Sequence, residues 1–193
     1  MEKIDTPFGI HAEFVSDRAV KNCINMYKKE QKRITPGKNG PRGRVSKHLK
    51  DSLDLGLESS EITRLKIYYN ELHKVIDNYV RKFPILKRFN PWGYVDGINI
   101  QYYKPGGGYH AEHTETMSYA EGHRLFVFMT YLTDTKDGGT EWTYLNWKSP
   151  CKKGLTLLWP SNYPYSHKGI ISNSEEKMII TGWFGFDKEY KDK

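Results

Sequence analysis

The chain has 193 residues, with 30 lysines and arginines against 23 aspartates and glutamates and a formal net charge of +7. This length favours one domain, which we expect to span residues 1–193. The composition, 37% hydrophobic with a further 17 glycines, excludes a wholly disordered chain. No apolar run approaches the roughly 20 residues that a membrane-spanning helix needs, so no membrane partner is expected.

The first residues, Met1 to Asp5, are polar and lack the apolar segment of a secretory signal. We therefore expect the mature protein to begin near Met1 and to be cytoplasmic. The two cysteines, Cys23 and Cys151, have no paired spacing. This indicates buried reduced thiols rather than a disulfide framework or a zinc ribbon.

Positive charge is concentrated in the first half of the chain. Residues 1–90 carry 19 basic and 11 acidic residues, whereas residues 91–193 carry 11 and 12. Segment 28–50 holds nine basic residues and one acidic residue, interrupted by glycines and prolines, which predicts a mobile basic loop. Such a loop could attract nucleic acid, but basic surface loops more often serve solubility and steering, so a nucleic-acid partner is not favoured.

Two helices are predicted before any regular strand pattern. Apolar residues recur at three- and four-residue intervals over 16–32, with Ser16 available as the N-cap. A longer pattern of the same kind covers 60–82, and Pro84 follows its end. Segment 51–57 between them could be extended or a turn.

Short apolar or alternating runs, rich in aromatic and β-branched residues, fill the second half of the chain. They predict seven strands, near 95–104, 109–116, 123–133, 140–145, 154–159, 166–171 and 177–186. The Gly138-Gly139 pair predicts a tight hairpin between the third and fourth of these strands. The runs Leu125–Met129 and Met178–Ile180 are apolar on both faces, as in a buried sheet.

The expected fold is mainly β with helical support (α+β), a sandwich or jelly roll braced by helices on one sheet. We expect helical support with a basic loop in residues 1–90, the core in 91–186 and a solvated tail in 187–193.

Two overlapping His-x-Glu pairs follow a triple glycine in the second half. Side chains two residues apart share a face of an extended strand, so His113 and Glu115 can bind one metal ion while His110 and Glu112 face the other way. The pattern alone is weak, because a solvated His-x-Glu pair is more common than a metal site.

Two later residues could complete such a site. His167 lies 54 residues after His113, far enough for the intervening strands to return it beside the first pair. Lys177 shares a predicted strand face with Thr181 and Trp183, and a buried lysine requires an anionic partner. Taken alone, Lys177 is more simply a lysine at the exposed end of a strand.

Several of these elements recur in a characteristic order and spacing. They are Tyr103-x-Pro105-Gly106 before His113-x-Glu115, Tyr131-Leu132, Gly138-Gly139-Thr140-Glu141, Trp159-Pro160 to His167-x-Gly169, and Lys177 leading to Gly182-Trp183. Together they resemble the prolyl 4-hydroxylase-like branch of the Fe(II)- and 2-oxoglutarate-dependent dioxygenases, particularly its short bacterial and phage forms, over residues 95–186. The first pair in that family is His-x-Asp, from which Glu115 departs by one methylene while keeping a carboxylate oxygen donor.

The resemblance implies a double-stranded β-helix (jelly roll) with an Fe(II) centre. Its metal ligands would be His113, Glu115 and His167, the two-histidine, one-carboxylate arrangement of non-haem Fe(II) oxygenases. The ten-residue offset from Tyr103 selects His113 over His110 as the first ligand.

The resemblance further implies 2-oxoglutarate as cosubstrate, with ascorbate as a candidate reductant. Lys177 would anchor the distal carboxylate of 2-oxoglutarate, and Tyr131 and Tyr103 would donate hydrogen bonds to the cosubstrate. Tyr131 lies on one strand face with Val127 and Met129, so its hydroxyl is expected to point inward. For both tyrosines, packing in the core is the alternative role.

The implied substrate is a prolyl residue in a peptide or protein, hydroxylated with release of succinate and CO₂. Segment 28–50 could then close over the peptide as a lid. One alternative keeps the chemistry but acts on a nucleobase or small molecule, as the basic first half suggests. Another is a catalytically inactive β-sandwich binding module, in which the His/Glu cluster is incidental. A zinc hydrolase fits less well, because no further general base is evident.

Overall fold

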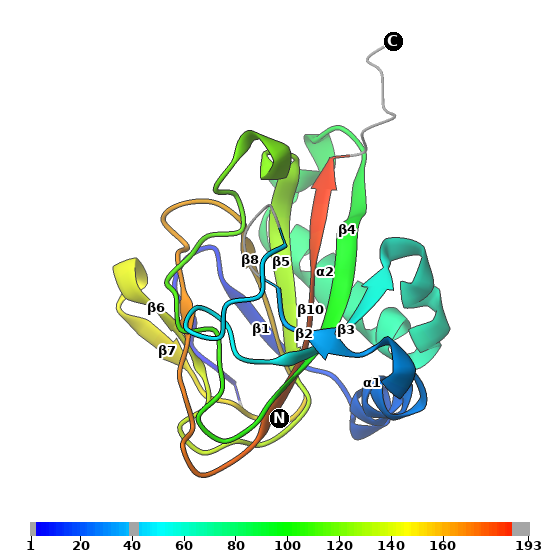
Figure 1. Ribbon diagram of the computed structural model, residues 1–193. Helices are drawn as coiled ribbons and strands as arrows, with labels where there is room; N and C mark the ends of the chain where they lie inside the picture. Colours follow the sequence, from blue (N-terminus) through cyan, green and yellow to red (C-terminus); the bar gives the residue numbers. More distant parts are fainter. Residues whose placement is uncertain (1–2, 39–42, 187–193) are drawn as a thin grey trace.

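The computed structural model describes residues 3–38 and 43–186 (Figure 1). Two antiparallel sheets form most of it. The larger sheet has the order β1-β8-β5-β10-β4-β3-β2, and the smaller has the order β7-β6-β9. The strands are β1 His11–Phe14, β2 Thr35–Pro36, β3 Leu53–Glu58, β4 Trp92–Tyr103, β5 Arg124–Tyr131, β6 Thr140–Trp142, β7 Trp147–Ser149, β8 Leu155–Pro160, β9 Lys168–Gly169 and β10 Lys177–Phe186.

The two helices pack together at the larger sheet. Helix α1, Asp17–Lys29, begins after the N-cap Ser16, whose hydroxyl accepts the backbone N–H of Ala19 at 3.2 Å. Helix α2, Lys66–Lys82, follows the 3₁₀ segment Ser59–Leu65 and ends before a proline. Both helices confirm the amphipathic patterns, although each is shorter than predicted because a 3₁₀ turn replaces one of its ends.

Alternation along the central strands separates two hydrophobic clusters. Ile98 and Ile100 of β4 and Phe128 of β5 pack with the helices in one cluster. Val127 and Tyr131 of β5 belong to the other, which includes the tryptophans of β6 and β8. The larger sheet therefore buries one face against helices and directs the other toward the smaller sheet, and this arrangement confirms the predicted α+β jelly roll.

The two sheets are bridged by the segment that follows β4. His113 forms an isolated antiparallel bridge with His167, just before β9. The predicted strand at 109–116 is therefore wrong as a regular strand, since the bridges at Tyr109 and His113 are isolated. The glycine-rich segment before His113 does not pair along one strand. Tyr109 bridges to Lys50, whereas His113 bridges to His167.

Other strand predictions hold only in part. The predicted strand at 177–186 coincides with β10, and those at 95–104, 123–133 and 154–159 correspond to β4, β5 and β8. The predicted strands at 140–145 and 166–171 shorten to β6 and β9, and strands β1, β2 and β7 were not predicted. Segment 51–57, left open above, belongs largely to β3.

The predicted Gly138-Gly139 hairpin is wrong. Strand β5 pairs with β8 and β10, whereas β6 pairs with β7 and β9 in the other sheet. The chain thus crosses between layers at these glycines. A side chain at Gly139 would collide with the Ser149 carbonyl of β7, so this glycine permits a close approach of two backbones.

The first ninety residues do more than support the core. They contribute β1 at one edge of the larger sheet and β2 and β3 at the other. We therefore infer one folding unit that joins the predicted support and the predicted core.

The basic segment 28–50 is not one loop. Its first residues complete α1, Thr35–Pro36 pairs with β3, and Lys50 forms a backbone bridge with Tyr109. Residues 39–42 and the predicted tail 187–193 lie outside the described residues. No helix in the described part of the chain is long and apolar enough to cross a membrane.

Candidate metal and cosubstrate site

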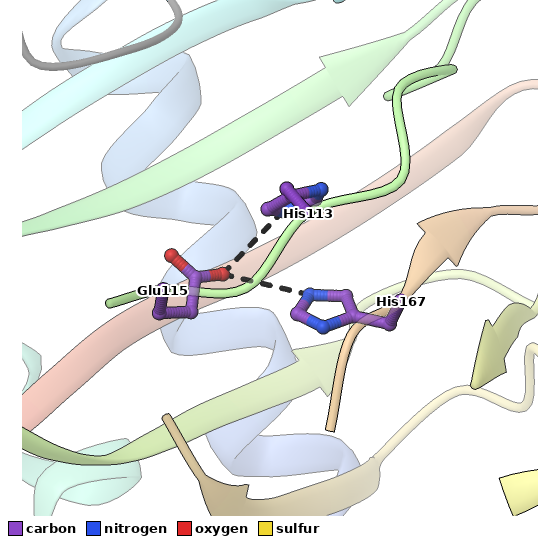
Figure 2. Close-up of side chains that lie close together, drawn as sticks. All are labelled: His113, Glu115 and His167. Carbon is purple, nitrogen blue, oxygen red and sulfur yellow. Dashed lines mark ion pairs between the residues drawn. The ribbon is translucent and has the colours of Figure 1, made fainter. Parts of the chain in front are cut away.

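Three side chains from distant parts of the sequence converge between the sheets. His113 and Glu115 lie on the segment after β4, and His167 lies just before β9 (Figure 2). Oxygen Oε1 of Glu115 is 3.6 Å from Nε2 of His113 and 3.5 Å from Nε2 of His167. All three potential ligand atoms lie within 4.8 Å of one another, so one ion could contact them all.

Backbone contacts orient both imidazoles toward this point. Nδ1 of His113 lies 2.9 Å from the carbonyl oxygen of Ala111, and Nδ1 of His167 lies 3.1 Å from that of Tyr165. A carbonyl can only accept, so each Nδ1 carries a proton, and each Nε2 is the ring nitrogen that a metal ion could bind. Such outer contacts commonly fix the tautomer of metal-ligating histidines.

The protonation states also suit metal binding. Burial lowers the pKa of His167, and the neighbouring His113 adds to this effect. Burial by itself would raise the pKa of Glu115, but hydrogen bonds and charge from the two imidazoles hold that pKa well below its usual value. The carboxylate of Glu115 is therefore ionised at neutral pH, as a metal ligand must be.

The second oxygen of Glu115 has its own partners. Nε1 of Trp183 donates to Oε2 at 2.9 Å, and Nη1 of Arg124 lies 3.8 Å from the same oxygen. The two carboxylate oxygens are thus distinguished, with Oε1 toward the histidines and Oε2 toward protein donors.

The three residues open into a cavity of about 660 Å³. Pocket-facing side chains of β4, β5 and β10 form one wall, including Tyr103, Tyr131 and Lys177. Lys177, Thr181 and Trp183 all line it, as the predicted shared strand face requires. The cavity also reaches Thr35, Pro36 and Lys38 of the basic segment.

Lys177 is buried in this cavity without an acidic partner. Lys177 is only 6% exposed, and its Nζ donates to the carbonyl oxygen of Ile170 at 3.0 Å. Nζ also lies 5.2 Å from the centre of the Tyr103 ring. Within the described residues, no carboxylate forms an ion pair with it. A buried ammonium so placed favours an anionic ligand.

The two predicted cosubstrate tyrosines differ in their surroundings. The Tyr131 hydroxyl lies 2.7 Å from both Thr140 Oγ1 and Ser149 Oγ, while the Tyr103 hydroxyl donates to Gln101 Oε1. Burial raises the pKa of both phenols, so both remain protonated donors. Both rings line the cavity, but their hydroxyls already have protein partners.

The competing pair does not enter the site. His110 and Glu112 are both exposed, and Glu112 accepts a hydrogen bond from Ser166 Oγ at 2.6 Å. The expected segregation of the two His-x-Glu pairs is therefore present, although only an isolated bridge at His113 produces it.

Sequence reasoning missed three contributors to the surroundings of the site. Tyr109 stacks on His113 with ring centroids 3.9 Å apart and 16° between the planes. Arg124 contacts Glu115, and Asp96 accepts from Arg124 Nε at 2.6 Å. The Asp96-Gly97 pair inside an apolar strand pattern was an available signal, because glycine within a strand often marks a bulge.

The donor set fits a ferrous ion. Two imidazole nitrogens and one carboxylate oxygen match the facial arrangement of non-haem Fe(II) oxygenases, in which open positions remain for other ligands. The unpaired ammonium of Lys177 in the same cavity suits an additional dicarboxylic acid.

Comparison with known proteins agrees with this geometry. Residues 98–185 match the model of the 2OG-Fe(II) oxygenase superfamily, a region that includes His113, Glu115, His167 and Lys177. The comparison with curated proteins found no match.

Solved prolyl hydroxylases share the fold at low sequence identity. A viral collagen prolyl hydroxylase from Paramecium bursaria Chlorella virus-1, in complex with 2OG, is 19% identical, with a TM-score of 0.67 and coverage of 93% of this chain and 97% of that one. A Pseudomonas putida prolyl-4-hydroxylase is 13% identical, with a TM-score of 0.68 and 93% coverage of both chains. A Trichoplax adhaerens prolyl hydroxylase, in complex with a hypoxia inducible factor peptide fragment, is 15% identical, with a TM-score of 0.68 and coverage of 94% and 85%.

Proposed function

We propose that the chain, whose residues 98–185 match the model of the 2OG-Fe(II) oxygenase superfamily, is such an oxygenase and hydroxylates a prolyl residue in a peptide or protein. The reaction would consume dioxygen and 2-oxoglutarate and release succinate and CO₂. Bound iron, with these cosubstrates, supplies oxidising chemistry that protein side chains lack. Ascorbate is proposed as the reductant that maintains activity.

One observation carries the proposal. A single cavity contains both the cluster His113, Glu115 and His167 and the buried ammonium of Lys177, which has no acidic partner among the described residues. A binding module without chemistry would have no need of an unpaired buried charge beside a potential metal site, because such a charge destabilises the fold.

Each residue has a distinct proposed role. His113, Glu115 and His167 hold the metal on one side and leave the other side open toward the cavity. Lys177 binds the distal carboxylate of 2-oxoglutarate through a charge-assisted hydrogen bond. Tyr131 and Tyr103 shape the cosubstrate pocket, and their hydroxyls could reach the cosubstrate by exchanging their present protein partners.

Two observations support a peptide as substrate. The solved structures with this fold include prolyl hydroxylases from a virus, a bacterium and an animal, and one of them holds a peptide. The cavity also extends to Thr35, Pro36 and Lys38 of the basic segment. A peptide bound in that part of the cavity would contact these residues.

Turnover with a panel of proline-containing peptides tests the proposal. The protein would be supplied with Fe(II), 2-oxoglutarate and ascorbate, and tandem mass spectrometry would locate any added oxygen atom. We expect the mass of one oxygen on a prolyl residue, with succinate formed in step, and neither product with His167→Ala. An oxygen added instead to a nucleic-acid oligomer or a small molecule would overturn the prolyl assignment.

A further inference from the structure

We propose that Asp96, Arg124 and Trp183 act as positioning residues that make Glu115 a one-oxygen metal ligand. The inference rests on the proposed metal role of Glu115 and concerns how this chain orients that side chain. None of the three residues is offered as a metal ligand.

The contacts of Glu115 divide its two oxygens. Oε1 lies about equally far from the two histidine Nε2 atoms, at 3.6 and 3.5 Å. Oε2 accepts the indole N–H of Trp183 at 2.9 Å and lies 3.8 Å from the Arg124 guanidinium. Because Oε2 is held by protein donors, only Oε1 remains free to bind an ion.

Arg124 holds both the backbone of Glu115 and the ring of Trp183. Its Nη1 donates to the Glu115 carbonyl oxygen at 2.9 Å. Its guanidinium carbon lies 4.2 Å from the centre of the Trp183 ring, a cation–π distance. One rigid, planar cation therefore fixes the backbone at Glu115 and the indole that donates to the Glu115 carboxylate.

Asp96 in turn fixes Arg124. Its Oδ2 accepts from Arg124 Nε at 2.6 Å, and His123 Nε2 lies 3.1 Å from each of its carboxylate oxygens. The backbone of Asp96 has φ 59°, the left-handed region that a non-glycine residue seldom occupies. Such strain persists where surrounding contacts maintain it, and here it directs the carboxylate at Arg124.

The sheet register places this strained residue next to the strand partner of Trp183. Strands β10 and β4 shift register between Thr181 and Trp183, and Trp183 pairs with Val95, next to Asp96. The bulge therefore brings the two outer members of the network to one place in the sheet.

A one-oxygen contact matters for the proposed chemistry. The facial arrangement keeps all its open positions only if the carboxylate takes a single one, because a carboxylate binding through both oxygens would occupy one of them. Glutamate has one more rotatable bond than the aspartate usual at this position in the family, so it loses more freedom when fixed. The contacts to Oε2 remove that freedom before any metal binds.

The test compares metal binding by the full chain and its variants. Mn(II), which is stable in air, is titrated into wild type, Asp96→Asn and Trp183→Phe, with Asp17→Asn as the matched control. Asp17 forms a surface ion pair with Lys153 at 3.0 Å, and neither residue lines the cavity. The visible spectrum of bound Co(II) reports ligand arrangement independently of activity.

We expect Asp96→Asn and Trp183→Phe each to weaken Mn(II) binding about tenfold or more, as loss of outer contacts to metal ligands commonly does. The Co(II) spectrum should change in both variants, and Asp17→Asn should match wild type. If Asp96→Asn does not fold, Trp183→Phe decides, because phenylalanine keeps an aromatic ring against Arg124 and lacks the N–H donor.

Two failures are distinguishable. Wild type that binds Mn(II), with both variants within twofold of its dissociation constant and unchanged in Co(II) spectrum, would overturn the positioning role alone. Wild type that binds neither metal would overturn the proposed metal site together with this inference.

Discussion

The ammonium of Lys177 lies over the Tyr103 ring, with Nζ 5.2 Å from the ring centre. Burial lowers the pKa of Lys177 to about 8. The hydrogen bond to the Ile170 carbonyl and the aromatic face therefore compensate only part of the lost hydration. A carboxylate bound in the cavity would restore the missing charge, which makes this lysine a sensitive indicator of 2-oxoglutarate binding.

The pH dependence of 2-oxoglutarate binding follows from this shift. Lys177 has a pKa of about 8 in the folded protein, below the usual 10.5, so the folded state binds its proton more weakly than the unfolded state does. The ligand-free protein should therefore gain stability as pH rises from about 8 toward 10.5. Affinity for 2-oxoglutarate should fall over the same range, because the anion requires the ammonium.

Calorimetric titration of the Mn(II)-loaded protein with 2-oxoglutarate, between neutral pH and the usual lysine pKa, measures this dependence. Lys177→Arg serves as the comparison, because arginine stays protonated throughout. An affinity that is constant across the range in wild type would contradict the proposed anchor.

Removal of the Lys177 charge should separate binding from stability. A charge-assisted hydrogen bond contributes roughly 1.5–3 kcal/mol, so Lys177→Met should raise KM for 2-oxoglutarate by about 10- to 100-fold. The ligand-free variant should unfold no more easily than wild type, since a buried unpaired charge is lost. Steady-state kinetics and thermal unfolding check the two effects, with the exposed Lys104→Met as control. An unchanged KM would exclude Lys177 from the cosubstrate site.

The two His-x-Glu pairs should behave differently on substitution. His113→Ala removes an imidazole whose Nε2 faces Glu115, so Fe(II) binding and turnover should be lost. His110→Ala changes an exposed side chain and should leave both largely intact. Anaerobic equilibrium dialysis against Fe(II) measures the binding. The reverse pattern would transfer the metal site to His110 and Glu112.

The buried ion pair of Lys50 and Asp54 should stabilise the edge of the site. Lys50 Nζ lies 2.6 Å from Asp54 Oδ2. The backbone of Lys50 pairs with that of Tyr109, and the Tyr109 ring stacks on His113. Lys50→Ala leaves the buried carboxylate unpaired and should cost about 3–5 kcal/mol. Urea unfolding checks this, and the double variant Lys50→Met with Asp54→Leu should recover most of the loss. Equal stability of Lys50→Ala and wild type would show that the pair contributes little.

The regular parts of the fold could be predicted because they follow local patterns. Strand β10 was predicted with its observed bounds, since Met178 and Ile180 face the helices while Lys177 and Ile179 face the cavity. The Gly138-Gly139 hairpin could not be predicted correctly, because a glycine pair permits a crossing between sheets as readily as a turn. Only the partners of β5 and β6, which are distant in sequence, decide between them.

In the site too, residues within motifs could be predicted, whereas contacts between residues distant in sequence could not. His113, Glu115 and His167 could be chosen from motif spacing, and the structure places them together. The hydrogen bond from Trp183 to Glu115 joins residues 68 positions apart and depends on a bulge in β4 and β10. The Asp96-Gly97 pair signals a bulge in β4, but no sequence pattern shows that this bulge lies beside Trp183 or that Arg124 joins Asp96 to Glu115.

Absorbance during anaerobic addition of Fe(II) and then 2-oxoglutarate examines the shared iron and cosubstrate site itself. We expect a weak visible charge-transfer band that requires both additions in wild type and is missing in His167→Ala. A wild-type protein that shows no band, or a band of equal strength in His167→Ala, would contradict a shared iron and 2-oxoglutarate site in this cavity.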